Sequence, residues 1–388
     1  MSPVARDRGL STGVMALEDD ARVDFDRLRR ARRARVFDAM KDRDLDALML
    51  GGVGNVRYVS GARSLGRAGV LPFAPVAVVV RATERVHLLS TWDEGVPPEI
   101  DRDSLYGLTW NPENLIASVA GIPGVGEAWR IGTDGLTPMF TAMMSSALPS
   151  AEIADAAALL AAVRRTKTYD EFTCVDVAAA IAESALSALE DALVPGVTER
   201  ELLGVYYERI ADRGTPIAPS ESVCFATAPT GPVAFRQLAS DRPIGEGELV
   251  VLAPSALYAG YEAGLARTRI AGGAVTPAAA RLASRCARSM DALLDVCRAG
   301  NTGADLYRAW QDADNDDSPV PLAHGVGLGA EPPLIGLGRG RGATLEEGMV
   351  LSVQSWVTEE GVGGCLERAT VRINGGGPSP ITRYGRVL

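Results

Sequence analysis

The sequence predicts an α+β protein built from two domains, and three observations support this prediction. The chain has 388 residues, which is more than a single domain usually needs. In the first half, short β-branched apolar runs are separated by Gly, Pro and charged residues, which is typical of strands in an α/β domain. In the second half, helical patterns alternate with segments typical of antiparallel strands, which indicates an α+β domain.

The first domain is expected to begin with a helix over residues 21–41, because apolar residues recur there at helical spacing beneath a strongly basic face. Strands are expected within 46–60 and 73–91. At about residue 156 the pattern changes to a long alanine-rich helical segment that continues to about 193. We therefore place the domain boundary between 158 and 159, which gives domains 1–158 and 159–388.

The second domain is expected to contain further helices and several strands. Helical patterns recur at 198–213, 277–298 and 303–314. Strands are predicted within ESVCFATA (221–228), GELVVLAPS (247–255), GYEAGLARTRIAG (260–272), GMVLSVQSWV (348–357) and CLERATVRIN (365–374).

The charge balance argues against a nucleic acid or a membrane surface as a partner. The chain carries 39 basic and 49 acidic residues, a net charge of −10, which repels phosphate backbones and anionic lipids. Hydrophobic residues make up 47% and charged residues 23%, which are values of a folded globular chain. We therefore expect a folded protein whose partners include neither nucleic acid nor a membrane.

The cysteines predict a reducing environment, and the apolar segments predict a soluble protein. The five cysteines are widely spaced and contain no C-x-x-C pair, so reduced structural thiols are expected. The first 25 residues lack the apolar core of a signal peptide, and no stretch has the roughly 18 uninterrupted apolar residues of a membrane span. We expect a cytoplasmic location.

Several stretches resemble the creatinase, aminopeptidase P and prolidase family. In the first domain these are DLDALML (44–50) and NVRYVSG (55–61). In the second they are VRRTKTYDEF (163–172), SDRPIGEGELVVL (240–252), GYEAGLARTR (260–269), HGVGL (324–328), LEEGMVLSVQSWV (345–357) and CLERATVRI (365–373). The resemblance implies a creatinase-type α/β N-terminal domain followed by a pita-bread domain.

Enzymes of this family usually bind two divalent metals through two aspartates, a histidine and two glutamates, a donor set that suits manganese, cobalt or zinc. Carried over position by position, the resemblance places the aspartates at Ala253 and Gly264, the histidine at His324, and the glutamates at Gln354 and Glu367. One imidazole and one carboxylate fill about half of a four-coordinate shell. We therefore expect no metal site and no other cofactor.

Creatinase, a metal-independent relative within this family, suggests acid/base chemistry instead, but its pattern is also incomplete. The position of its acid/base histidine falls at Arg236, and the position of its strand glutamate falls at Ala266. The resemblance therefore predicts the fold, but it does not supply a complete set of catalytic residues.

His324 is the predicted catalytic centre, because it is the only histidine of the second domain and therefore the only imidazole there for proton transfer near neutral pH. Glu367 is expected to orient the ring and to stabilise its protonated form. The alternative is that His324 only satisfies buried backbone groups. Glu262 and Glu331 are further acid/base candidates, with charges at the pocket rim as their alternative.

The remaining candidates are expected to bind substrate. Arg236 and Arg267 are suited to holding a carboxylate in a bidentate fork, although a structural ion pair is the stronger expectation for Arg267. Gln354 has the size of the expected glutamate without its charge. The other expected contacts are Tyr261 and Trp356 as walls of the pocket, and Arg63 in a loop that, by the resemblance, reaches the neighbouring pocket of a homodimer.

Three functions follow from these residues. The first is a metal-independent enzyme that acts on a small amino-acid-like or amide substrate by C–N hydrolysis, elimination or cyclisation, for example in a biosynthetic pathway. The second is a catalytically inactive relative whose cleft binds a peptide or metabolite. The third is a metallopeptidase that uses Glu262 and Glu331 as substitute ligands.

Overall fold

The computed structural model describes residues 22–62, 74–90, 95–107, 109, 111–213, 219, 222–227 and 233–385. The chain forms two compact units that divide between Arg164 and Arg165. The boundary expected between 158 and 159 falls inside helix α5 (Ala157–Arg165).

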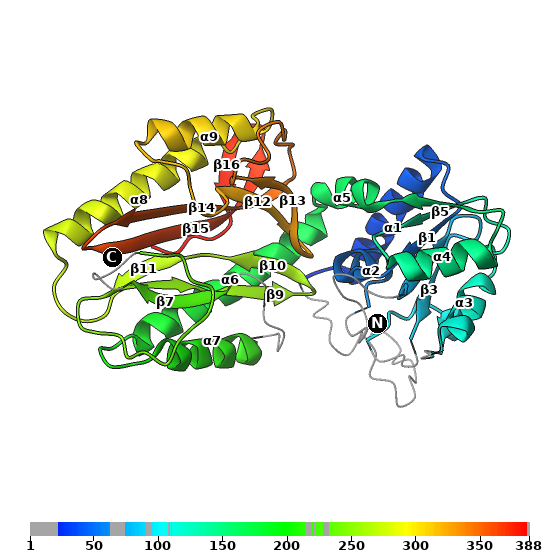
Figure 1. Cartoon of the computed structure of the whole chain (residues 1–388), viewed down its shortest axis with the longest axis horizontal. Helices are drawn as coiled ribbons and strands as arrows, with labels where there is room; N and C mark the ends of the chain where they lie inside the picture. The colour runs from blue at the N-terminus through cyan, green and yellow to red at the C-terminus, as the bar shows by residue number, and fades with distance from the viewer. Residues whose placement is uncertain are drawn as a thin grey trace, which may run out of the picture. The chain divides into compact units, whose positions relative to one another are not determined.

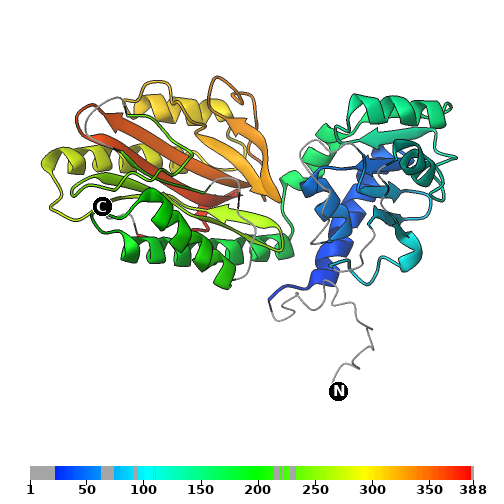
Figure 2. The same cartoon turned by 60° about the horizontal axis from the view of Figure 1, so that its bottom comes forward.

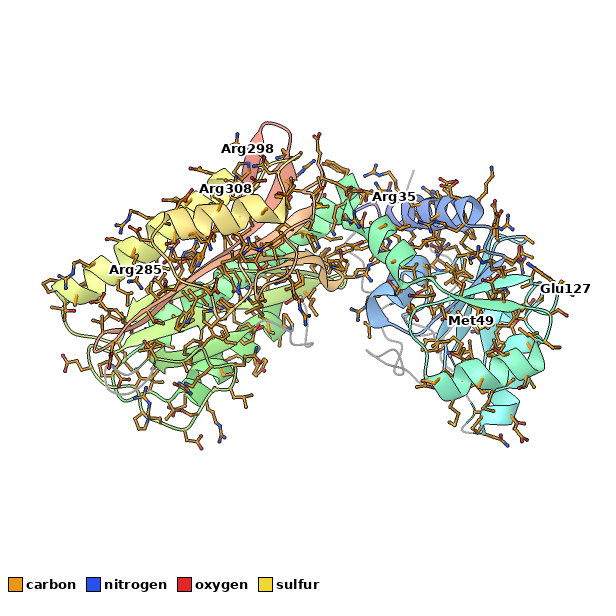
Figure 3. All side chains as sticks on the ribbon, turned by 45° about the horizontal axis from the view of Figure 1, so that its top comes forward. Arg35, Met49, Glu127, Arg285, Arg298 and Arg308 are labelled. Atoms are coloured by element: carbon orange, nitrogen blue, oxygen red, sulfur yellow. The ribbon has the colours of Figure 1, made fainter. Side chains whose placement is uncertain are left out.

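The N-terminal unit has a six-stranded mixed sheet in the order β4-β3-β2-β1-β5-β6. Figure 2 draws this unit in the blue to green part of the colour range. Strand β1 pairs antiparallel with β2 and parallel with β5. Helices α3 and α4 bury one face of this sheet, where Phe140 packs with Met49 and Ile131. Met49 lies within this sheet in Figure 3. The elements are α1 (Phe25–Asp42), β1 (Ala47–Leu50), α2 (Val53–Ser60), β2 (Ala77–Val80), β3 (Arg85–Leu89), η2 (Arg102–Ser104), β4 (Leu105–Tyr106), α3 (Pro112–Ala120), β5 (Arg130–Thr133), α4 (Pro138–Ala147) and β6 (Glu152–Asp155).

The basic helix expected over 21–41 is confirmed as α1. Asp24 caps its N-terminus by accepting a hydrogen bond from the Arg27 amide at 2.8 Å. Leu28, Val36 and Met40 form its buried stripe. Arg29 is buried as well, where it pairs with Glu99 from a distant loop.

The strand expected within 46–60 is only partly correct, because its second half forms helix α2. After β1, the amides of Gly51 and Gly52 donate to the Asp134 carboxylate at 2.9 Å each, which turns the chain out of the sheet. The helix then ends at Gly61, whose φ of +73° suits glycine. Long-range contacts thus override the β-branched pattern of this segment.

The C-terminal unit has the expected α+β architecture. A five-stranded sheet in the order β13-β12-β14-β15-β16 joins a three-stranded sheet in the order β11-β8-β7 through a bridge between Ala266 and Arg368. Helices α8 and α9 lie on one side of these strands and α6 and α7 on the other (Figure 1). The elements are α6 (Tyr169–Ala192), α7 (Glu199–Arg213), β7 (Val223–Thr227), β8 (Leu249–Ala253), β9 (Ser255–Tyr258), β10 (Tyr261–Gly264), β11 (Arg267–Ile270), α8 (Pro277–Asp295), α9 (Gly303–Asp312), β12 (Ala323–Gly327), β13 (Gly329–Ile335), β14 (Val350–Glu359), β15 (Gly363–Asn374) and β16 (Gly377–Pro380).

The long helix expected from about 156 to 193 is two helices, α5 and α6. Thr168 and Glu171 form a capping box that starts α6, with the Thr168 amide donating to Glu171 Oε2 at 2.8 Å. Helix α6 is long and apolar enough to span a membrane, but 61% of its apolar window is buried inside the structure, as in a core helix.

Two layers of apolar side chains fix the strands that carry the site. Beneath α8, Cys286, Met290 and Leu293 pack on Val353 and Ala369 of the five-stranded sheet. On the other face of β14 and β15, Trp356 and Leu366 pack with Phe225, Val251 and Ala253. Side chains of β14 and β15 therefore alternate between a helix-covered face and a face that meets the three-stranded sheet.

Candidate functional site

The candidate site lies on the face of β14 and β15 that meets the three-stranded sheet. His324 on β12 is in register with Ser352 on β14, and Gln354 is in register with Arg368 on β15. Directly opposed residues of antiparallel strands share a face, as do alternate residues along one strand. His324, Gln354, Trp356 and Arg368 therefore occupy one wall, and all four are at most 6% exposed.

Hydrogen bonds fix the orientation of the polar groups on this wall. The Gln354 amide nitrogen donates to the Pro321 carbonyl at 2.9 Å. Its Oε1 accepts from Arg368 Nε at 3.0 Å and from Arg368 Nη2 at 2.8 Å. Gln354 thus holds one edge of the buried guanidinium and sets its plane.

The imidazole of His324 is oriented by its own strand. Its Nδ1 lies 2.9 Å from the Gly325 carbonyl oxygen. Because a carbonyl oxygen only accepts, Nδ1 carries the proton in this hydrogen bond. In the neutral ring the basic lone pair is then on Nε2.

A cavity of about 930 Å³ opens in front of this wall, a size within the usual range for small-molecule sites. His324, Gln354, Trp356 and Arg368 line one part of it. Phe235 adds an aromatic surface, with its ring centroid 5.6 Å from that of Trp356 and 5.5 Å from that of Phe225. Further lining comes from an acidic segment, Asp314–Asp317, and from Arg285 on α8.

Glu367 was expected to orient His324. The structure instead places the Glu367 side chain on the face of β15 that is turned away from the cavity. Glu367 is in register with Ser355, and it does not line the cavity. Side chains alternate along a strand, so an offset of one residue moves a group to the opposite face. The residue that accompanies Gln354 in the cavity is Arg368, which was not among the expected site residues.

Glu331 is held in a buried ion pair and does not line the cavity. Its Oε2 lies 2.7 Å from Lys167 Nζ, with the side chains 6% and 2% exposed. Its Oε1 accepts from the Leu328 amide at 3.2 Å. This carboxylate therefore holds the β12–β13 hairpin, and the structure places it neither among the cavity-lining acid/base groups nor at the cavity rim.

The two expected arginine clamps contact the protein instead of lining the cavity. Arg236 forms an ion pair with Glu199 on α7 and donates to the Ala226 carbonyl at 3.1 Å. Arg267 donates from Nη1 to the Arg368 carbonyl at 2.9 Å and from Nη2 to the Tyr384 carbonyl at 2.7 Å. Arg267 thus donates to backbone carbonyls of β15 and of the C-terminal segment.

Tyr261 is also directed away from the cavity, because its hydroxyl donates to Glu171 of α6 at 2.7 Å. Glu262 is the next residue on β10, so its side chain lies on the opposite face of that strand. It is buried and does not line the cavity. Arg63 lies outside the described residues.

The metal-ligand positions implied by the resemblance do not provide a matching donor set. Ala253 and Gly264 lack donor atoms, and a Cβ on Gly264 would lie 2.2 Å from Ser255 Oγ. Arg368 adds a guanidinium beside Gln354. Among the described residues, no three His, Cys, Asp or Glu side chains form a cluster that could hold a metal ion. This wall does not fit a pair of divalent ions.

Comparison with known proteins identifies the family. Residues 173–374 match the metallopeptidase family M24, and residues 32–166 match the creatinase/prolidase N-terminal domain. The C-terminal unit thus has the pita-bread fold, and the N-terminal unit is the creatinase-type domain expected from the sequence. This chain belongs to the metallopeptidase family M24, whose members are hydrolases.

Individual relatives support the same assignment. The chain is 23% identical over 373 residues to an uncharacterized hydrolase/peptidase, y4tL, of Sinorhizobium fredii, a match covering 89% of this chain and 92% of the relative. A Xaa-Pro dipeptidase from Bacillus anthracis has the same fold, with a TM-score of 0.74 and 19% identity over 92% of this chain and 98% of the other. The dipeptidase PepE from Mycobacterium ulcerans gives a TM-score of 0.71 and 20% identity over 95% and 98%.

Proposed function

We propose that this protein is a creatinase/prolidase-type hydrolase that cleaves a C–N bond of a small amino-acid-like amide without a dinuclear metal centre. The observation that carries the proposal is the guanidinium of Arg368, buried on the cavity wall and bonded to Gln354. A positive side chain at this place repels divalent cations, and Ala253 and Gly264 supply no carboxylates to hold them. Proton transfer by His324 then supplies the chemistry.

His324 has the orientation that a general base needs. The Gly325 carbonyl accepts from Nδ1, which leaves Nε2 to take a proton from an attacking water. The water oxygen forms a bond to the carbonyl carbon, the C–N bond breaks, and the imidazolium returns its proton to the leaving nitrogen. The rings of Trp356 and Phe235, in edge-to-face contact, form an apolar surface beside the reacting bond.

A panel of small amides tests this function in the presence of a chelator. The panel contains Xaa-Pro dipeptides, N-acyl amino acids and creatine. We expect turnover of at least one class that is insensitive to the chelator. His324→Ala should lower kcat by roughly 10²- to 10⁴-fold, the usual contribution of a general acid/base group.

His87, the only other histidine in the chain, provides the matched control. It is buried on β3 beside Tyr106, and neither ring nitrogen has a hydrogen-bond partner among the described residues. His87→Phe keeps an aromatic ring there and should leave turnover unchanged. Turnover that appears only on addition of manganese or zinc would contradict the proposal. No turnover of any amide would favour the second candidate, a pocket that binds without catalysis.

An enzyme of this kind acts on a small molecule, in agreement with the net negative charge of the chain. The homodimer and the cytoplasmic location expected from the sequence stay predictions.

A further inference from the structure

We propose that Arg236 is a positioning residue for the substrate. Its ion pair with Glu199 holds Phe235 against Trp356, and the aromatic surface formed in this way binds the apolar part of the substrate. This inference rests on the proposed function, because it concerns the same cavity. Arg236 then acts through Phe235 and does not itself contact the ligand.

The chain segment that carries Arg236 has no regular secondary structure to hold it. Residues 233–240, all of which the structure describes, form no helix or strand, and we call them the wall segment. The wall segment lines the cavity with Val233, Ala234, Phe235, Gln237 and Leu238. A segment outside the helices and strands depends on contacts of its side chains for its position.

Glu199 supplies these contacts. It is the first residue of α7, which lies beside β7 (Figure 1), and its side chain is fully buried. Its Oε2 accepts from the amide and the hydroxyl of Ser240 at 2.8 Å each, and its carboxylate pairs with Arg236. Its Oε1 accepts from the Ala226 amide of β7 at 2.8 Å. One buried carboxylate thus fixes two points of the wall segment to β7.

Arg236 is turned away from the cavity, and this orientation determines that of its neighbours. Its Nη2 donates to the Ala226 carbonyl at 3.1 Å, and its guanidinium lies 5.6 Å from the centroid of the Phe225 ring. Phe235 and Gln237, on either side of it in the chain, line the cavity, whereas Arg236 does not. This alternation is that of an extended chain. Fixing Arg236 on the outside therefore keeps Phe235 on the cavity side.

Phe235 joins aromatic rings from two sheets. Its ring centroid lies 5.5 Å from that of Phe225 on β7 and 5.6 Å from that of Trp356 on β14, both in edge-to-face contact. Phe235 is only partly buried, so part of its surface is open to a ligand in the cavity. Val223 and Val320 extend the apolar lining. A large apolar group buries more surface on this wall than a methyl group does.

Isothermal titration calorimetry with two neutral probes tests the inference on the full chain. The probes are N-acetyl-L-phenylalaninamide and N-acetyl-L-alaninamide, which differ only in the size of the apolar side chain. The unchanged protein should bind the phenylalanine probe roughly 10- to 100-fold more tightly, as expected for burial of an aromatic side chain. This ratio of affinities measures the apolar surface, because neither probe is charged.

Two single variants should lower this ratio by similar amounts. Phe235→Ala removes the ring, and Arg236→Met removes the group that holds it, so each should lower the ratio roughly 10-fold. Arg236→Lys keeps the charge without the planar fork and should restore only part of the ratio. Arg242→Met is the matched control, because Arg242 pairs with Glu248 at 2.9 Å and neither residue lines the cavity. It should keep the full ratio. Circular dichroism checks the folding of each variant.

A double variant separates positioning from a general effect on stability. When Phe235→Ala is already present, Arg236→Met should change the ratio by less than about 2-fold, because no ring is left to position. A further loss as large as in the single variant would overturn the inference, since independent effects add. A ratio near one in the unchanged protein would also overturn it, as would binding of neither probe at millimolar concentration. These two outcomes require no variant to fold.

The result is separate from that of the turnover assay. A preference for the phenylalanine probe that depends on Arg236, without turnover of any amide, removes only the proposed hydrolase. Turnover together with a ratio that Arg236→Met leaves unchanged removes only the role of Arg236. For an aromatic amide that is turned over, Arg236→Met should raise KM by a larger factor than it lowers kcat, because it affects binding and leaves His324 in place.

Discussion

Lys167→Met is expected to destabilise the C-terminal unit by about 3–5 kcal/mol, because it leaves the Glu331 carboxylate buried without its cationic partner. The two side chains are 2% and 6% exposed, and their charged atoms are 2.7 Å apart. Lys167 stands between α5 and α6, and Glu331 is on β13, so the ion pair ties the start of α6 to the hairpin that carries His324. Urea denaturation followed by circular dichroism measures this loss of stability.

The chain provides its own control for this substitution. Lys41, the only other lysine, is exposed at the end of α1, so Lys41→Met should change stability within about 0.5 kcal/mol. The double variant Lys167→Met with Glu331→Leu should recover part of the loss, because it removes both buried charges. Equal losses in the single and the double variant would contradict the explanation that the buried Glu331 carboxylate causes the loss of stability.

Glu199→Ala is expected to lower the free energy of unfolding by about 3 kcal/mol or more, because one fully buried carboxylate accepts hydrogen bonds from several donors. Glu199 accepts from the amides of Ala226 and Ser240 and from the Ser240 hydroxyl, each at 2.8 Å, and it pairs with Arg236. Glu208→Ala, at an exposed position of the same helix, is the matched control and should be neutral. Thermal unfolding of both variants measures the difference.

The same carboxylate should give stability a defined pH dependence. Burial alone would raise the pKa of Glu199, but the hydrogen bonds from Arg236, Ala226 and Ser240 together hold this pKa below its usual 4.5. The unfolded chain then binds the proton more tightly than the folded chain does. The stabilisation is therefore present above pH 4.5 and is lost as the pH falls through the lower folded pKa. Glu199→Ala should unfold with a weaker dependence on acid, and an unchanged dependence would contradict this role.

The sequence predicted the elements whose signals are local. Helix α1 has an aspartate cap and an apolar stripe, and α8 begins with Thr276 capping and Pro277 in its first turn. The break between α5 and α6 also had a local signal, the pair Thr168 and Glu171 at capping-box spacing, which the alanine-rich pattern concealed. Helix α2 was missed because the turn that precedes it depends on Asp134, which is distant in sequence.

Site residues could be predicted from the sequence only where the motif itself determines which face of the strand a side chain occupies. His324, Gln354 and Trp356 were expected in the pocket, and the structure places all three on one cavity wall. Glu367 was expected in the pocket from its place in the CLERAT stretch, but Arg368 is the residue that opposes Gln354, and this pairing between distant strands decides which side chain faces the cavity. The ion pairs of Arg236 and Glu331 join segments far apart in the chain, so no local pattern indicated them.

A titration with divalent metal tests the central claim most directly. Protein purified without chelators is titrated with manganese and then with zinc by calorimetry, alongside His324→Ala, and its metal content is measured by mass spectrometry. We expect no metal in the purified protein and no binding that depends on His324, because Arg368 occupies the wall where metal ligands would be needed. A pair of tightly bound ions per chain that His324→Ala removes would contradict the account.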